Sequence, residues 1–185
     1  MGRNANNHRD QEQKASIESA WPFEGKVLKI HQDTIKVPGH LPYIRECAVM
    51  PKAVAIIPID SQGNILLIEQ WRRSIGMITL EIPAGMMDHE GEQPIECAQR
   101  ELQEETGFFA RSLKPFGGCY PSPGVTSEYI HLFLGTDLEP RPLEADDTHL
   151  IDSRSISLAD ALKMIDKGEI IDAKTVIGIM RYARL

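Results

Sequence analysis

Three glutamates lie close together near the middle of the chain, at positions 101, 104 and 105. On a helix Glu101 and Glu105 are i,i+4 neighbours, and Glu104 is three residues from Glu101, so one flank carries all three charges. Like charges at this spacing destabilise a helix by about 0.2–0.5 kcal/mol per pair. Glu104 and Glu105 would also occupy the last turn, where the helix dipole favours cations. The spacing therefore predicts a cation here, and hard divalent ions such as Mg²⁺ or Mn²⁺ take oxygen ligands of this kind.

A plain alternative is a solvated acidic face on which Arg100 pairs with its neighbours, and on charge alone this interpretation comes first. The helix itself is expected over residues 93–106. Pro94 suits a first turn, apolar side chains recur at helical spacing, and Gly107 is placed to end the helix. What favours the metal interpretation is the wider pattern around this helix.

The elements that must position the helix are strands for the most part. Alternating or continuous apolar runs, separated by turn residues, predict strands at 25–37, 42–50, 53–59, 65–71, 78–85, 129–138 and 150–157. The turn at 60–64 predicts a hairpin between the third and fourth of these strands. Loops are expected at 117–124 and 139–149, and two more helices at 158–168 and 172–184. This order predicts an α+β fold, an α/β/α sandwich with a mixed sheet and an N-terminal antiparallel region.

The stretch from Gly85 to Phe108 closely resembles the Nudix box. In that pattern a glycine loop leads to a glutamate, a spacer, and then Arg-Glu-aliphatic-x-Glu-Glu-x-Gly-aliphatic. Here Glu92 is followed by the spacer 93–99 and by RELQEETGF at 100–108, so every specified position in this half matches. The resemblance implies a divalent-metal-dependent hydrolase, with Mg²⁺ or Mn²⁺ as cofactor. It implies that Glu101, Glu104 and Glu105 bind metal and act in catalysis, that the Ala84 carbonyl is a further metal ligand, and that Gly85, Glu92, Arg100 and Gly107 are structural.

One departure from the pattern lies in the loop that opens the box. Gly85 and Glu92 are separated by MMDHEG, which is one residue longer than the family spacing. Moving the glycine position to Met86 would displace the preceding residues 83–85, so we reject that register. An extra loop residue costs little, since even doubling a loop costs only about 0.6 kcal/mol of closure entropy. We expect a bulge at 89–90 that leaves the ligands in register.

The resemblance extends from about residue 25 to 183 and is strongest to the ADP-ribose pyrophosphatase branch of that family. The motifs that carry it are EQWRR at 69–73, LEIPAG at 80–85, YPSPG at 120–124, HLFLG at 131–135 and GEIIDAKT at 168–175. Pro123 also stands sixteen residues after Gly107, where the branch has a proline. The resemblance implies hydrolysis of ADP-ribose or a related nucleoside diphosphate sugar to a nucleoside monophosphate and a sugar phosphate. It also implies a homodimer whose N-terminal strands cross between subunits.

Four residues are candidates for binding the substrate. Arg72 follows a buried strand and carries a fork of donors suited to a pyrophosphate, although a surface salt bridge is the alternative. Arg45 on an early strand is a candidate for a contact across the subunits. Pro123 and Gly124 stiffen a loop that would wall the sugar site, or simply form a tight turn.

The general base is expected in the acidic loop 143–152, because relatives often take it from a loop at this place. Glu144 is preferred because glutamate has the longer reach, and Asp146 and Asp147 are the alternatives. A merely solvated acidic loop is also compatible with the sequence.

Composition limits the other possibilities. The net charge of −7 disfavours binding to nucleic acid, and no apolar run approaches the ~20 residues that span a bilayer. Three scattered cysteines without metal-like spacing favour reduced thiols in a cytoplasmic protein. We expect a flexible arm at 1–18, a strand region with dimer contacts at 19–50 and the hydrolase domain at 51–185. The alternative functions are an RNA 5′-pyrophosphohydrolase and a non-catalytic nucleotide-sugar-binding regulatory module.

Overall fold

The chain divides into two compact units, each described here by itself. The computed structural model describes residues 13–144 and 151–185. The smaller unit comprises Met1–Pro51 together with Ser122–Glu128, and the larger comprises Lys52–Pro121 and Tyr129–Leu185. The boundary after residue 51 lies one residue from the division proposed on sequence grounds. No sequence pattern predicted that Ser122–Glu128 would join the N-terminal unit.

The smaller unit is a three-stranded antiparallel sheet. Its strands β1 (Ser16–Glu24), β2 (Lys29–Lys36) and β3 (Tyr43–Val49) are paired in chain order. A turn that contains Gly39 joins β2 to β3, and this glycine adopts a φ of 81° that only glycine takes without strain. The first strand begins at Ser16, so the last residues of the segment 1–18, expected to be a flexible arm, are strand residues.

The larger unit contains two sheets. The four-stranded sheet has the order β7 (Ala84–Met86), β4 (Ala53–Pro58), β9 (Ile130–Pro140) and β8 (Phe108–Cys119), in which β4 and β9 run parallel. The three-stranded sheet has the order β10 (Asp152–Ile156), β5 (Ile65–Arg72) and β6 (Met77–Glu81), all antiparallel. The α+β class with a mixed sheet is therefore confirmed.

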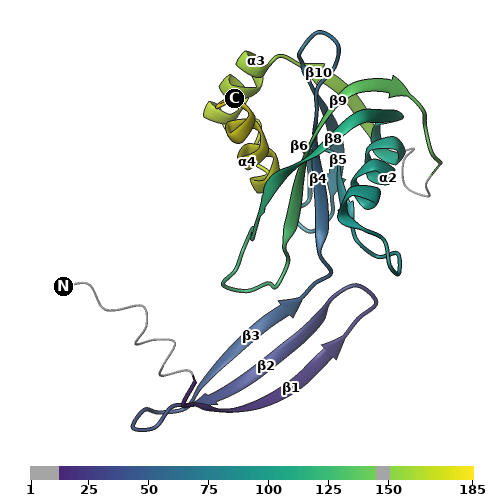
Figure 1. Cartoon of the computed structure of the whole chain (residues 1–185). Coiled ribbons are helices and arrows are strands. Elements are labelled where there is room, and N and C mark those ends of the chain that lie inside the picture. The colour runs from purple at the N-terminus through teal and green to yellow at the C-terminus, as the bar shows by residue number, and fades with distance from the viewer. Residues whose placement is uncertain (1–12, 145–150) are drawn as a thin grey trace. The chain divides into compact units, whose positions relative to one another are not determined.

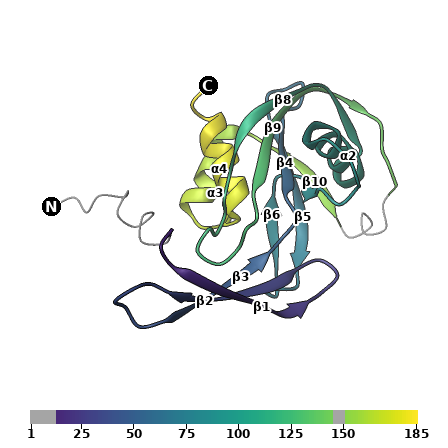
Figure 2. The same cartoon turned by 60° about the horizontal axis from the view of Figure 1, so that its bottom comes forward.

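Helices lie on both sides of the central strands. In Figure 1 helix α2 (Pro94–Thr106) lies on one side of β4, and α3 (Leu158–Asp166) and α4 (Ala173–Tyr182) lie on the other. Every residue of β4 is buried, because its alternate side chains enter two cores. Val54 and Ile56 pack with α2, whereas Ala55 and Ile57 pack in the core that α3 and α4 share. Figure 2 shows the same layering from below, with α2 and α4 on opposite sides of the strands.

The predicted hairpin at 60–64 is wrong in its pairing. The turn itself forms, since Asp60 accepts hydrogen bonds from the backbone of Gln62 and Asn64 at 2.8 and 2.9 Å. The two strands then separate into different sheets, and only the bridge between Ile59 and Ile65 joins them. The turn depends only on residues that are close in the sequence. Which strands pair depends instead on the hydrophobic core that each strand face must join.

Two further strand predictions need correction. The segment 78–85 is not one strand: β6 ends at Glu81, and β7 begins at Ala84 in the other sheet. The loop expected from 117 begins later, because β8 continues to Cys119 as an unpredicted twelve-residue strand. Its pairing with β9 shifts register between Pro115 and Gly117. A proline and a glycine are unusual inside a strand, so the sequence pattern did not predict one here.

Helix α2 follows the prediction closely. It begins with Pro94, and the Gln93 backbone N–H before it donates to Glu96 Oε2 at 2.9 Å. It ends at Gly107, whose φ of 75° is left-handed and whose N–H donates to the Gln103 carbonyl at 2.9 Å. The predicted helices near the C-terminal end of the sequence are confirmed as α3 and α4.

Among the described residues, no helix has the length and apolar content to cross a bilayer. Cys47, Cys97 and Cys119 form no disulfide. Burial raises the pKa of the Cys97 thiol to about 12, so this side chain is an unreactive part of the core beneath α2.

Candidate active site

Helix α2 packs its acidic flank against the backbone at Ala84 and Gly85. A Cβ atom built on Gly85 would lie only 2.0–2.2 Å from the carboxyl atoms of Glu101. Glycine is therefore needed here for a steric reason, since any side chain would push the Glu101 carboxylate off the strand. The Glu101 carboxylate therefore lies directly against the backbone at Gly85. The preceding residue, Ala84, is the one whose carbonyl is predicted to bind metal.

Glu105 lies against the same backbone. The Ala84 N–H donates to Glu105 Oε2 at 2.8 Å. Burial raises the pKa of Glu105 to about 8, and the nearby charge of Glu101 adds to the rise, while the Ala84 hydrogen bond and the cations Lys174 and Arg72 oppose it. The pKa of Glu101 is also raised, chiefly by burial and then by repulsion from Glu104. The two carboxylates are held where their charges are only partly compensated.

Arg100 is the main cation on this flank. Its Nε and Nη2 donate to the two oxygens of Glu92 at 2.9 and 3.1 Å, the bidentate arrangement that fixes the loop before α2 to the helix. Its Nη1 donates to Glu101 Oε1 at 2.7 Å and to Glu104 Oε2 at 3.0 Å. Hydrogen bonding to Arg100 holds the pKa of Glu92 below its ordinary value. One guanidinium thus serves three carboxylates, which leaves a net negative charge.

The donor set fits a hard divalent cation. Glu101 and Glu105 offer carboxylate oxygens beside the Ala84–Gly85 backbone, and Glu104 is next along the helix. Within residues 13–144 and 151–185 no three carboxyl, imidazole or thiol groups converge as a closed metal cluster. The reason is visible in the contacts, because Glu101 and Glu104 turn to Arg100 in this arrangement. Binding a cation would require those two side chains to exchange Arg100 for the ion.

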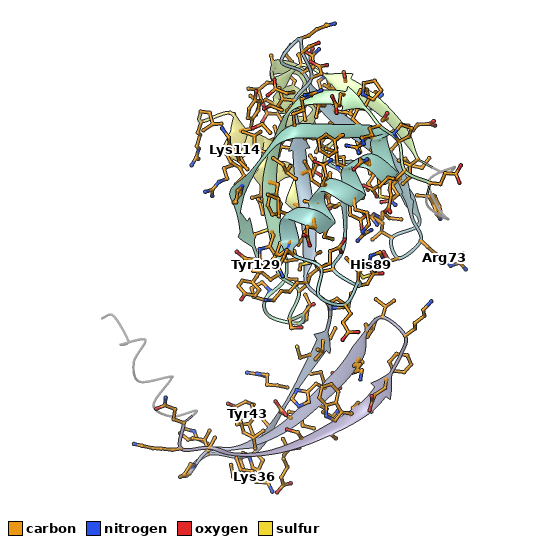
Figure 3. The ribbon with its side chains drawn as sticks, turned by 45° about the vertical axis from the view of Figure 1, so that its right-hand side comes forward. Lys36, Tyr43, Arg73, His89, Lys114 and Tyr129 are labelled. Atoms are coloured by element: carbon orange, nitrogen blue, oxygen red, sulfur yellow. The ribbon has the colours of Figure 1, made fainter. Side chains whose placement is uncertain are left out.

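The extra residue in the box loop is absorbed by a turn. The Glu92 N–H donates to the His89 carbonyl at 3.2 Å, and Gly91 takes a φ of 79°. Figure 3 shows His89 on this loop, between β7 and α2. Because the turn delivers Glu92 to Arg100, the loop ends with its carboxylate in register with the helix.

A second ionic cluster lies beside the first, and its centre is the buried Glu81 at the end of β6. Arg72 donates to it twice, from Nε at 2.7 Å and from Nη2 at 2.5 Å. Thr79 Oγ1 donates to Oε1 at 2.5 Å, and Lys174 Nζ donates to Oε2. Burial alone would raise the pKa of Glu81, but Arg72, Lys174 and Thr79 together lower it to about 2. Glu81, Thr79 and Lys174 were not among the site residues predicted from the sequence. Two of the motifs quoted above nevertheless contain Glu81 and Lys174.

This second cluster revises the picture of Arg72. The predicted phosphate-binding side chain is half-buried and held by Glu81, so it is neither free nor an ordinary surface salt bridge. The neighbouring Arg73 is exposed, and Figure 3 shows it extending away from the strands. Interaction with Glu81 raises the pKa of Arg72, and the charges of Glu105 and Asp172 contribute.

The remaining predicted residues lie in several different elements. Arg45 lies in the smaller unit, with its guanidinium 4.8 Å from the centre of the Tyr43 ring. Pro123 and Gly124 are exposed residues of a turn in that unit. Glu144 is exposed in the larger unit, and Asp146 and Asp147 lie outside the described residues. Their proposed roles stay predictions.

A family model described as the NUDIX domain matches residues 49–176. This chain belongs to the Nudix family. The match covers the whole of the box and both clusters described above, so the resemblance seen in the sequence is confirmed. Membership identifies the acidic flank of α2 as the part of the fold that defines a Nudix hydrolase.

The relatives of this Nudix protein match it along most of its length. An ADP-ribose pyrophosphatase of Bacillus subtilis strain 168 is 35% identical over 165 residues, which is 88% of each chain. A methanol dehydrogenase activator of Bacillus methanolicus is 33% identical over 175 residues, 94% of each chain. A solved structure titled as an ADP compounds hydrolase has a TM-score of 0.83, covers 93% of this chain and 94% of its own, and is 23% identical, so it shows the shared fold.

Proposed function

We propose that this protein hydrolyses the pyrophosphate bond of ADP-ribose or a related nucleoside diphosphate sugar, releasing a nucleoside monophosphate and a sugar phosphate. The observation that carries the proposal is the placement of Glu101 and Glu105 against the Ala84–Gly85 backbone, where a side chain on residue 85 would displace the Glu101 carboxylate. The similarity to an ADP-ribose pyrophosphatase supports the substrate class.

In the proposed reaction a water oxygen forms a bond to one phosphorus, and the bond from that phosphorus to the bridging oxygen breaks. The bridging oxygen leaves with the electron pair on the other phosphate. Mg²⁺, with Mn²⁺ as a substitute, would neutralise charge on the pyrophosphate oxygens when bound. Glu101, Glu104 and Glu105, with the Ala84 carbonyl, are the groups that would hold it. Glu144 is proposed to take the proton of the attacking water, with Asp146 or Asp147 in its place if the loop presents them instead.

Arg100 and Arg72 have different parts in this scheme. Arg100 forms ion pairs that hold Glu92 against the helix and neutralise Glu101 and Glu104. When a metal cation binds, it would neutralise Glu101 and Glu104 in place of Arg100. Arg72 is proposed to bind the pyrophosphate, because its guanidinium carries a fork of donors and lies near enough to Glu105 for their charges to interact. Arg45, Pro123 and Gly124 remain proposed contacts to the nucleotide or sugar.

The test is Mg²⁺-dependent hydrolysis of a panel: ADP-ribose, ADP-glucose, GDP-mannose, UDP-glucose, NADH, diadenosine polyphosphates and capped RNA. Glu105→Gln should lower kcat on the preferred substrate by about a thousandfold, because a metal ligand supplies several kcal/mol of transition-state stabilisation. Glu101→Gln should have a similar effect. Glu96→Gln is the matched control, since this exposed glutamate lies on the same helix away from the packed flank. Lack of turnover by the wild type on every diphosphate would refute the proposal, as would full activity of Glu105→Gln.

A second function is favoured by the similarity to a protein named for activating a methanol dehydrogenase. In that case this chain would act on, or bind to, a nucleotide in the service of a partner enzyme. The two functions separate in one comparison. A purely regulatory protein would show no turnover as the wild type, and its affinity for nucleotide sugars would be the same in Glu105→Gln. A hydrolase would turn over substrate as the wild type and lose this turnover in Glu105→Gln.

We also propose that the protein is a cytoplasmic homodimer formed through its N-terminal unit. Strand β1 exposes three large apolar side chains, with Ile17 and Phe23 each 54% exposed and Trp21 49%. Exposed apolar side chains gathered on one strand are typical of a contact surface. Light scattering should give twice the mass of the chain, and Trp21→Glu should shift it toward the monomer.

A further inference from the structure

We propose that Glu81 and Lys174 are positioning residues, which hold the Arg72 guanidinium in a fixed orientation for the pyrophosphate of the substrate. The inference rests on the proposed function, and it adds a second set of residues to the site that the box defines. None of these residues belongs to the acidic flank of α2.

Glu81 is arranged to hold an arginine and not merely to neutralise it. Its side chain is 2% exposed, whereas that of Arg72 is 37% exposed, so the carboxylate is fixed inside and the guanidinium reaches the surface. The two parallel hydrogen bonds, from Nε and Nη2, define the plane of the guanidinium as well as its position. Within residues 13–144 and 151–185, Arg72 Nη1 makes no hydrogen bond, which leaves one edge of the fork for a ligand.

The carboxylate of Glu81 is itself held from two sides. Thr79 donates to the oxygen that accepts from Arg72 Nε, and the buried Lys174 donates to the other oxygen. With all these donors in place, rotation of the carboxylate would break several charge-assisted bonds at once. Glu81 therefore cannot follow Arg72 if the arginine moves, and it sets where the arginine must lie.

The first turn of α4 fixes Lys174 in turn. Asp172 precedes this helix, accepts from Lys174 Nζ at 3.1 Å and accepts from the Thr175 N–H at 3.0 Å. Thr175 Oγ1 accepts a hydrogen bond from the Ile82 N–H at 2.9 Å. The start of α4 is thus bonded to both Glu81 and the residue after it, just before the backbone of the box begins. The same few contacts orient Arg72 and support the strand that leads to Ala84.

This arrangement explains why a charged pair is kept in a buried place. Replacing a buried ion pair by apolar residues is often neutral or stabilising, so stability alone does not require it. A carboxylate that fixes the plane of an arginine while leaving one edge open does require charge, and it gives orientation that a flexible side chain lacks.

The experiment compares Glu81→Asp with the wild type. The shorter side chain keeps the charge but withdraws the carboxylate from Arg72, so at least one of the two parallel hydrogen bonds is lost. KM for ADP-ribose should rise about tenfold, the usual effect of one charge-assisted hydrogen bond, while kcat changes by less than about threefold. The dissociation constant for α,β-methylene ADP-ribose, which is not hydrolysed, should rise by the same factor as KM.

A double-mutant cycle separates positioning from general damage. In the Arg72→Ala background, Glu81→Asp should change KM and the dissociation constant by less than about twofold, because its effect acts through Arg72. Glu69→Asp is the matched control, since Glu69 is on β5 and pairs instead with Arg154 at 3.2 Å. Thermal unfolding checks that each variant is folded. If Glu81→Asp does not fold, Thr79→Val removes one donor to Glu81 and should raise KM about threefold.

The outcomes are distinct for the two proposals. If the wild type hydrolyses ADP-ribose and folded Glu81→Asp binds it normally, the positioning role is wrong and the proposed function stands. If Glu81→Asp weakens binding equally with and without Arg72, the positioning role is also wrong. If the wild type binds the analogue but turns over no substrate, hydrolysis fails while the cycle still decides the role of Glu81. If the wild type neither binds the analogue nor hydrolyses any substrate of the panel, both proposals fail.

Discussion

Glu81 and Glu105 are two carboxylates of the same unit with opposite electrostatic fates. The pKa of Glu81 is lowered to about 2, whereas that of Glu105 is raised to about 8. Burial acts in the same direction on both, toward the neutral acid. The difference lies in their partners: among residues 13–144 and 151–185, Glu81 has two cations and a hydroxyl group within hydrogen-bonding distance, while Glu105 has one backbone N–H.

A cluster whose charges are balanced thus differs from a site prepared for an ion. Around Glu81 and Asp172, two positive side chains balance two negative ones, so the cluster is complete as it stands. On α2, Arg100 alone faces Glu92, Glu101 and Glu104, with Glu105 beyond its reach. A cluster that lacks positive charge in a partly buried place is one that a divalent cation would stabilise.

The largest expected effect on the free energy of unfolding comes from replacing one glutamate of each cluster with glutamine, in separate variants. Glu81→Gln should lower the free energy of unfolding by roughly 3–5 kcal/mol, because Arg72 and Lys174 would be left facing a neutral amide. Glu105→Gln, measured without divalent ions at pH 7, should raise the free energy of unfolding, because it removes a group that burial disfavours as a charge. Urea unfolding with both variants in one buffer makes the comparison.

Equal destabilisation by the two glutamines would contradict the distinction drawn above. Glu96→Gln serves as the reference for the loss of a glutamate at an exposed position on α2. Its effect should stay within about 1 kcal/mol, because a glutamine can still accept the hydrogen bond from the Gln93 N–H and only the charge near the helix N-terminus is lost.

A smaller effect is expected from pH and Mg²⁺ together. Without divalent ions, folded Glu105 keeps a proton that the unfolded chain loses at a pKa of 4.5, so stability should fall as pH rises from about 4.5 to 8. Saturating Mg²⁺ should remove this fall, since a ligating carboxylate is ionised. At a concentration a hundredfold above its dissociation constant, the ion would add about 2.7 kcal/mol.

Glu81 gives the opposite slope and serves as an internal check on that measurement. Its pKa is depressed from 4.5 to about 2, so its contribution is present above pH 4.5 and is lost as pH falls toward 2. Mg²⁺ should not alter this acid limb. Calorimetric midpoints between pH 3 and 9, with EDTA or with Mg²⁺, would show both. A gain from Mg²⁺ that is the same at pH 5 and pH 8 would contradict the assignment of Glu105.

The smallest effect is expected from Gly85→Ala. The added methyl group would meet the Glu101 carboxyl atoms at 2.0–2.2 Å, and the long side chain of Glu101 can move away. We expect a cost of about 1–3 kcal/mol in stability, typical of overpacking, and about tenfold weaker Mg²⁺ binding. Gly124→Ala is a control for the loss of a glycine, because nothing lies within 4 Å of that position and its backbone is not left-handed. Unchanged Mg²⁺ affinity in Gly85→Ala would argue against the placement of Glu101.

Local signals account for what the sequence predicted well. Helix α2 was predicted within one residue, since Pro94 marks its first turn, the apolar repeat runs along it and Gly107 follows its last residue. The box has many residue types at set spacings, so the stretch could still be recognised as a Nudix box although its loop is one residue longer. The pairing of Arg100 with Glu92 follows from the same stretch, because both partners lie within it.

Non-local choices account for what was missed. Glu81 lies in LEIP, where it reads as one polar position in an alternating strand, and its partner Lys174 is 93 residues away. The failed hairpin at 60–64 had correct turn residues, but β4 and β5 pack in different sheets. Strand β8 was hidden by the bulge at Pro115–Gly117, which interrupts the periodicity that strand prediction uses.

The contact between Glu81 and Lys174 has a consequence for synthesis on the ribosome. At about 5–20 residues per second, the 93 residues between them take roughly 5–20 seconds to appear. For the part of that interval that follows residue 108, Glu81, Arg72 and the complete box have been synthesised, whereas α4 has not. The nascent chain must therefore hold Glu81 with Arg72 as its only strong counter-ion and with Ile82 lacking the Thr175 acceptor. Because α4 is made after the strands and the box that it joins, Arg72 gains its final orientation only once Lys174 has appeared.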